Sequence, residues 1–210
     1  MLTDSAAQAL SILRDTSLFQ WYVIPLFALV VYVYSVEIER RNWNLVFAGL
    51  AFWGLDWINE TWNSLVLHFS GYAPMWGAPS KTALLILVGL NIEIMFMFAI
   101  AGIAFGKMLP ADPKLRIVGI PNRIFLAITN SAFCVVVEIW LNSIGVLTWD
   151  WRYWSASSPV PIFLFGYLHF FLISYWVHDM KTVRAKVITV GIIIGIAISG
   201  LVVFGALGWV

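Results

Sequence analysis

Residues 44–69 read NLVFAGLAFWGLDWINETWNSLVLHF, a long and mainly apolar stretch that contains two carboxylic acids, Asp56 and Glu60. About twenty helical residues are enough to cross the roughly 30 Å hydrocarbon core of a bilayer. An ionised carboxyl group at the centre of such a helix costs about 2.5 to 3.5 kcal/mol even on translocon scales. The stretch therefore predicts a transmembrane helix whose two acids have a specific reason to be there.

The rest of the chain has the same character. Of its 210 residues, 61% are hydrophobic and 11% are charged, whereas soluble domains carry roughly 25% charged residues. The formal charge of +1 gives no reason to expect nucleic acid as a partner. We predict an all-α, polytopic transmembrane bundle that forms a single domain over residues 1–210, with residues 1–18 as a short helix at the membrane interface. The six predicted spans are residues 19–36, 44–69, 82–105, 124–147, 160–180 and 187–209.

Lysine and arginine are distributed unevenly between the two ends of this predicted bundle. Only Arg14, Lys81 and Arg152 lie on the side that holds both termini. By the positive-inside rule, the basic connections face the cytoplasm and both termini lie on the non-cytoplasmic side. This orientation fits a bacterial inner membrane, which we favour, or an endoplasmic reticulum. The basic residues predicted to face the cytoplasm are Arg40, Arg41, Lys107, Lys114, Arg116, Arg123, Lys181, Arg184 and Lys186.

The last predicted span contains no charged residue between positions 187 and 209 and is rich in small residues. Gly191, Gly195 and Ser199 recur at four-residue spacing, which allows another helix to approach closely. We expect this stripe to serve helix packing, either within one chain or between the chains of a homo-oligomer. No internal repeat of the kind found in many transporters is recognised.

Polar residues inside the predicted spans form two stripes. Asp56, Glu60 and Asn63 lie at positions i, i+4 and i+7 of one helix, and a second stripe on the fourth span includes Glu138. We expect the two stripes to share one cavity, with further walls from the third and fifth spans. The predicted catalytic residues are Glu60, Asp56, Glu138, His169 and Glu93, and the predicted substrate-binding residues are Asn63, Asn91, Asn142, Trp57, Trp62, Trp140 and Tyr167.

A structural role for these acids is the alternative. Carboxyl groups can stay neutral in lipid and bond across helices to asparagine and serine side chains. Tryptophans near the predicted turns, including Trp76, Trp149 and Trp154, are expected to anchor the protein at the membrane surface.

The residue types limit the possible chemistry. The chain has three histidines and one cysteine, Cys134, and it lacks a nucleophile elbow, a phosphate-binding loop and a zinc motif. We therefore predict acid–base chemistry without a cofactor. A neutral carboxylic acid protonates a double bond, a second group removes a proton, and aromatic walls stabilise the intermediate cation. An isoprenoid or sterol-like lipid dissolved in the membrane is the expected substrate.

Two other functions remain open at this point. The same acids could carry protons or cations through a transporter or channel. The protein could instead be a non-catalytic subunit that binds a lipid, quinone or pigment.

Two family resemblances point to isoprenoid chemistry. Asp56-x-x-x-Glu60 with Trp57 and Trp62 resembles the His-x-x-x-Glu element of the emopamil-binding-protein (EXPERA) sterol isomerases, which implies a further acid such as Glu93. Asp56 replaces the histidine of that family. Glu60, the turn Pro79-Ser80-Lys81 and Asn91 are similar to elements of integral membrane terpene cyclases, although Asn59 stands where those cyclases have tryptophan.

A further likeness lies in the fourth span. The run Glu138-Ile139-Trp140-Leu141-Asn142 and the following tryptophan-rich turn resemble membrane carotenoid cyclases, but the paired acids that those enzymes carry on the next helix are missing. From the residues and the chemistry together, we predict that Glu60 is the proton donor, that Asp56 influences this donor, and that Glu138 or His169 accepts a proton.

Overall fold

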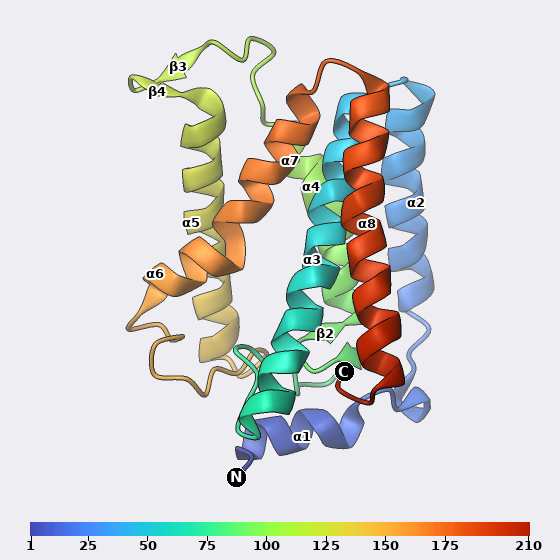
Figure 1. The fold of residues 1–210 in the computed structure, drawn as a ribbon, viewed down its shortest axis with the longest axis vertical. Coiled ribbons are helices and arrows are strands. Elements are labelled where there is room, and N and C mark those ends of the chain that lie inside the picture. The colour runs from blue at the N-terminus through green and yellow to red at the C-terminus, as the bar shows by residue number, and fades with distance from the viewer.

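A computed structural model describes all residues from 1 to 210. Long helices run between the two ends of the molecule, and both termini lie at the same end (Figure 1). The helices are α1 (Asp4–Ile12), α2 (Val23–Glu39), α3 (Trp43–Ser70), α4 (Ile92–Gly106), α5 (Asn122–Ser143), α6 (Pro159–Pro161), α7 (His169–Asp179) and α8 (Val183–Ala206), with a short 3₁₀ turn η1 (Thr16–Leu18) and a π-helical segment η2 (Ile162–Leu168). The strands are β1 (Leu85–Leu87), β2 (Leu90–Asn91), β3 (Arg116–Ile117) and β4 (Ile120–Pro121).

Helix α3 is the centre of the bundle. It packs against α4, α7 and α8, while α2 packs mainly on α4 and α5 packs on η2 and α7. The core around α3 is aromatic, since Phe52 lies 5.2 Å from both Phe170 and Phe171 between ring centroids. This arrangement places the acids of α3 between several other helices.

Three helical segments are long and apolar enough to cross a membrane: Asn122–Ser143, Pro159–Asp179 and Val183–Ala206. The chain is therefore a mainly helical membrane protein. The predicted count of about six spans is not established, because α2 and α4 have 17 and 15 residues and α3 carries its acids within the apolar run. About twenty residues are needed for a perpendicular crossing.

The predicted third span is wrong at its beginning. Residues 82–91 do not continue a helix; they lead into the hairpin of β1 and β2, and α4 begins only at Ile92. Leu85, Leu87 and Leu90 are fully or almost fully buried in this hairpin. A short buried strand and a membrane helix share the same hydrophobicity, so hydropathy alone could not separate them.

A second hairpin precedes α5 at the opposite end of the bundle (Figure 1). It turns through Val118 and Gly119, both with positive φ, as two-residue hairpin turns require. The first hairpin also turns at a Val-Gly pair, Val88 and Gly89, and also leads into a helix. The sequence reading missed this short repeat, whose first copy is buried and whose second copy is exposed.

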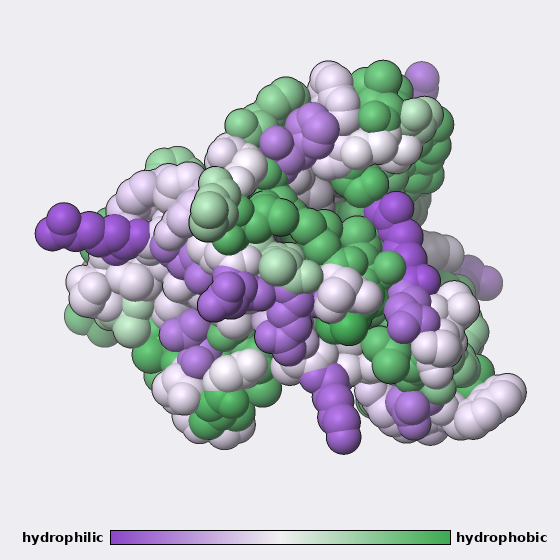
Figure 2. Space-filling model, turned by 90° about the horizontal axis from the view of Figure 1, so that it is seen from below, coloured by the Kyte–Doolittle hydropathy of each residue, from purple (hydrophilic) through white to green (hydrophobic).

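The end that carries both termini is covered by α1 and by the connections around it. Figure 2 shows this end, where several strongly hydrophilic side chains project among hydrophobic ones. Thr3 caps α1 by accepting a hydrogen bond from the backbone N–H of Ala6 at 3.3 Å. Asp150, in the tryptophan-rich connection, accepts hydrogen bonds from the Thr3 hydroxyl at 3.1 Å and the Ser5 hydroxyl at 2.5 Å. These bonds tie α1 to the rest of the bundle.

We expect Asp150→Ala to release α1 from the bundle. The substitution removes a charged acceptor from two hydroxyl groups, and hydrogen bonds to charged groups contribute about 1.5 to 3 kcal/mol each. Limited proteolysis after residue 12 should become at least several-fold faster. Asp4→Ala, which removes an exposed acid from the same helix, is the matched control, and equal proteolysis of the two variants would contradict this account.

The opposite end is held by ion pairs. Lys107 lies 2.6 Å from the buried Glu37 and so joins α4 to α2. Arg123 donates two hydrogen bonds of 2.8 Å to the Asp179 carboxylate and joins α5 to α7. Lys186 donates to the carbonyl oxygens of Val177 and His178, which end α7. These charged groups are therefore already engaged in holding helix ends together.

The small-residue stripe of α8 does not pack within the chain. Gly191, Gly195 and Ser199 are exposed, and added Cβ atoms at the two glycines would meet nothing within 4 Å. Helix α8 instead contacts α3 through Ile193, which would collide with a Cβ on Gly54 at 2.9 Å. The predicted close approach of a neighbouring helix to the stripe is therefore absent from the monomer.

Candidate functional site

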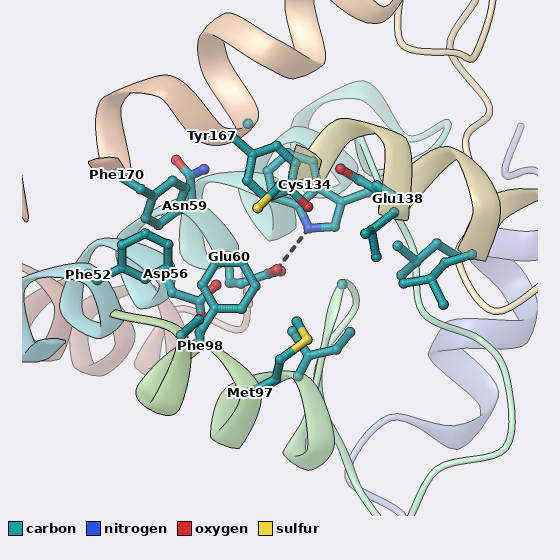
Figure 3. A pocket seen from close by; sticks show the side chains of 18 of the residues that line it. Phe52, Asp56, Asn59, Glu60, Met97, Phe98, Cys134, Glu138, Tyr167 and Phe170 are labelled. Atoms are coloured by element: carbon teal, nitrogen blue, oxygen red, sulfur yellow. Dashed lines mark hydrogen bonds between the residues drawn. The ribbon is translucent and has the colours of Figure 1, made fainter. Parts of the chain in front are cut away.

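A cavity of about 440 Å³ lies among α3, α4, α5 and the π-helical segment η2 (Figure 3). Hydrophobic residues make up 17 of the 23 that line it. The few polar groups therefore stand out, and three of them are acids. The polar, aromatic and thiol side chains most relevant to chemistry are Asp56, Asn59, Glu60, Trp76, Cys134, Glu138, Trp154 and Tyr167.

Glu60 is held in place by an indole. The Trp76 Nε1–H donates a hydrogen bond of 2.8 Å to Glu60 Oε1, which Figure 3 marks as a dashed line. Glu60 Oε2 is buried without any hydrogen-bond partner. One oxygen is thus held by the indole, and the other makes no hydrogen bond within the protein.

Asp56 lies one helical turn before Glu60 and also faces the cavity. Its side chain is 2% exposed, and Asp56 Oδ2 has no hydrogen-bond partner. The two carboxyl groups lie on the same face of α3, at positions i and i+4, and line the same cavity. Buried polar atoms are normally satisfied, so these orphaned oxygens indicate a partner such as a ligand or an ordered water.

Glu138 enters the same cavity from α5. The Trp149 Nε1–H donates to Glu138 Oε1 at 3.3 Å, and the Tyr167 hydroxyl faces this carboxyl group from η2. Glu138 and Glu60 line the same cavity from different helices. Acids from two separate helices therefore converge, as the two stripes in the sequence predict.

The connection after α3 is fixed by Asn63, which is fully buried. Its amide donates to the Trp76 carbonyl oxygen at 2.7 Å and accepts from the backbone N–H groups of Met75 and Trp76 at 2.7 and 3.3 Å. Asn63 thus positions the indole that holds Glu60, although it does not itself line the cavity.

The tip of the β1–β2 hairpin completes this corner. A Cβ on Gly89 would lie 2.4 to 2.7 Å from Asn63, Glu60 and Trp76, so only glycine fits at this position. The buried hairpin therefore forms a wall of the site, next to the Glu60 carboxyl group.

Aromatic rings cover the part of the cavity beyond Asp56. Phe52, Phe98 and Phe170 lie within 5.2 to 5.6 Å of one another between ring centroids. In Figure 3 these rings and the acids surround the same space. A positive charge formed there would meet ring faces, which attract cations.

The π-helical segment supplies the wall opposite α4. Runs of π-helix are rare and often occur at functional sites. Gly166 and Tyr167 of this segment line the cavity, and a Cβ added to Gly166 would meet the Trp154 ring at 3.5 Å. The segment lies just after Pro159 and Pro161.

Several predicted site residues lie elsewhere. Glu93 accepts hydrogen bonds from the Thr82 hydroxyl, the Ala83 N–H and the Tyr22 hydroxyl, and Asn91 caps α4 by accepting from Ile94 N–H. Neither lines the cavity, because α4 begins at Ile92 and both residues belong to its start. The other predicted residues that do not line it are His169, Asn63, Asn142, Trp57, Trp62 and Trp140.

Specific contacts explain some of these differences. The Asn142 amide donates to the Leu147 carbonyl oxygen at 3.0 Å in the turn after α5. Trp140 is 60% exposed and points away from the bundle. His169 follows the π-helical segment, whose wider turn changes which residues face inward, so that Tyr167 and Phe170 line the cavity instead.

The sequence reading also missed cavity residues. Trp76 and Trp154 were expected at the membrane surface, but they are 8% and 2% exposed and stack on each other at 5.4 Å. Asn59 also lines the cavity. Cys134 lines it as well, as its four-residue spacing from Glu138 on the predicted stripe indicates. The inward fold of the tryptophan loops left no signal in the sequence.

The structure contains no cluster of side chains suited to a metal ion. No group of three or more histidine, cysteine, aspartate and glutamate side chains lies close enough together to hold a metal ion.

Comparison with known proteins gives a family but no activity. A protein of Archaeoglobus fulgidus, described as an uncharacterized protein, is 55% identical over 211 residues, and the match covers 100% of both chains. A second uncharacterized protein of that organism is 51% identical over 53 residues, which are 25% of this chain and 95% of that protein. No solved structure matches. A family model matches residues 3–206, and it describes neither sterol isomerases nor terpene cyclases, so the resemblances to those two families are unconfirmed. The chain belongs to the family described as an uncharacterized membrane protein family.

Proposed function

We propose that the protein is a cofactor-independent membrane isomerase or cyclase that acts on an isoprenoid or sterol-like lipid. The observation that carries the proposal is the convergence of Asp56, Glu60 and Glu138 on one mainly apolar cavity. The unpaired oxygens of Asp56 and Glu60 suit a reaction that moves protons within a mainly apolar site.

The proposed reaction begins at Glu60. This group gives its proton to one carbon of a C=C bond, and the electron pair of that bond forms the new C–H bond. The neighbouring carbon becomes a cation, which lies among Phe52, Phe98 and Phe170. Asp56, one turn away, influences the readiness of Glu60 to release its proton.

Glu138 completes the reaction as the base. It takes a proton from a carbon next to the cation, and the electrons of that C–H bond form a new double bond. If a second double bond attacks the cation first, the product contains a ring. Between turnovers Glu138 loses its proton to water and Glu60 takes up a proton from water, which restores the enzyme, so that in H₂O substrate and product have the same mass.

The distribution of polar groups supports this chemistry over transport. A transporter needs a polar route to both membrane surfaces. The side of the cavity away from the acids is walled by Phe52, Phe105 and Phe170. Nearer that end of the bundle, Glu37 and Asp179 are held in ion pairs with Lys107 and Arg123. The proposed orientation places the acids towards the non-cytoplasmic side of the cell membrane, on the side of both termini.

The test is conversion of candidate polyprenyl and sterol-like lipids by purified protein in liposomes, followed by chromatography and mass spectrometry. The wild-type protein should give a product of unchanged mass, and Glu138→Gln should give it at least about 100-fold more slowly, because loss of a general base typically costs 10²- to 10⁴-fold. Equal rates would contradict the role of Glu138. A lipid that binds without any product would favour the lipid-binding module over the enzyme.

A further inference from the structure

The wall of the cavity is not equally buried all around. Trp76, Gly89 and Trp154 are buried on the side of the loops, and Phe52 and Phe170 are buried on the far side. The lining residues classed as exposed are Met97, Ala104 and Phe133. All three lie on α4 or α5, so the mouth of the cavity lies between these two helices.

The packing of the helices agrees with this position. α5 packs on η2 and α7, and α4 packs on α3 and α2, but α4 and α5 barely contact each other. On the other side of the cavity, the Asn59 amide donates to the Phe165 carbonyl oxygen at 3.4 Å and so links α3 to η2. The bundle is therefore joined on one side of the cavity and open on the other.

The height of the mouth decides which solvent it meets. Met97 and Phe133 lie well inside α4 and α5, away from the ends of both helices, and they are 50% and 59% exposed. Side chains at this height on a membrane helix face hydrocarbon rather than water. Both are large and apolar, as suits a surface in contact with lipid chains.

We infer that the ligand enters the cavity sideways from the bilayer through an opening between α4 and α5, with Met97 and Phe133 at its mouth, and that it is accordingly a membrane-dissolved hydrocarbon lipid rather than a water-soluble molecule. This inference deepens the proposed function. Only the chemical conversion of the lipid inside the cavity rests on the proposed function; the route of entry does not. The opening would admit a flexible chain between Met97 and Phe133, so that the reacting double bond can reach the acids.

The single cysteine of the chain offers a direct test. Cys134 lines the cavity next to Phe133. In liposomes containing the full-length protein, a pyrene-labelled maleimide that dissolves in the bilayer should modify Cys134 at least ten-fold faster than a charged, membrane-impermeant methanethiosulfonate. The control for a water-exposed thiol is Val118→Cys in a Cys134→Ser background, because Val118 is 87% exposed at the tip of the second hairpin. That control should react readily with the charged reagent.

Two further variants locate the route. Met97→Trp or Phe133→Trp should slow modification of Cys134 by the pyrene reagent several-fold, whereas Phe27→Trp, on the exposed face of α2, should leave the rate unchanged. Rapid modification of Cys134 by the charged reagent would overturn the inference, and so would an equal effect of all three substitutions. Failure of both reagents to reach Cys134 in the folded protein, with full reaction in detergent-denatured protein, would also overturn it.

This experiment is independent of turnover. Labelling through the bilayer combined with an absence of product would leave the lateral opening in place and would reject only the acid–base function. Product formation combined with modification from water would do the opposite.

Discussion

Glu60→Gln is expected to lower the rate of lipid conversion by about 10²- to 10⁴-fold, the usual contribution of a general acid. Glutamine keeps the size of the side chain and can still accept the Trp76 indole hydrogen bond through its amide oxygen. It has no proton that it can give to a carbon atom under these conditions. The loss should therefore appear in the rate of conversion, with little change in lipid binding.

The control for this variant is Glu39→Gln, which changes an exposed acid at the end of α2. Rates are measured at several lipid fractions in liposomes, and folding is checked by the thermal midpoint in detergent. If Glu60→Gln and Glu39→Gln convert lipid equally fast, Glu60 is not the proton donor.

Asn63→Leu is expected to be the most destabilising single substitution at the site. It leaves the N–H groups of Met75 and Trp76 and the Trp76 carbonyl oxygen without their partner in a fully buried position. Each unsatisfied buried group costs about 1 to 3 kcal/mol, so the free energy of unfolding should fall by about 3 kcal/mol or more. Conversion should also fall, because the Trp76 indole would no longer be positioned.

Asn142→Leu provides a matched comparison for this variant. Asn142 makes one side-chain hydrogen bond, to the Leu147 carbonyl oxygen, in a half-buried turn, so its loss should cost only about 1 kcal/mol. Both free energies are measured by denaturant titration in the same detergent micelles. Equal destabilisation by the two substitutions would show that the Asn63 bonds do not hold the loop.

Helical periodicity predicted the three acids of the site, Asp56, Glu60 and Glu138. The four-residue spacing of Asp56 and Glu60 and the depth of Glu138 on its own helix place these acids on inward faces, because a polar group in lipid is driven towards other polar groups. The structure brings all three to one cavity. The same reasoning located α3, α5 and α8 to within a few residues.

The errors arise where the backbone leaves the regular α-helix. Asn91 and Glu93 belong to a helix start behind a buried hairpin, which hydropathy could not distinguish from a longer helix. The π-helical segment alters the register before His169, so that His169 does not line the cavity, whereas the predicted Tyr167 does. Trp76 and Trp154 reach the cavity because their loops fold back over it. This folding depends on contacts between distant parts of the sequence, such as the stacking of the two indoles and the hydrogen bond from Asn63 to the Trp76 carbonyl oxygen.

The central claim is that acids in a lipid-accessible cavity transfer a proton to the carbon skeleton of a lipid, and deuterium incorporation tests it most directly. Wild-type protein in liposomes prepared in D₂O is incubated with a convertible isoprenoid, and the product is analysed by mass spectrometry. The account predicts a product heavier by one deuterium, bound to carbon, which Glu60→Gln does not form. A product without carbon-bound deuterium, formed equally by the wild-type protein and Glu60→Gln, would contradict it.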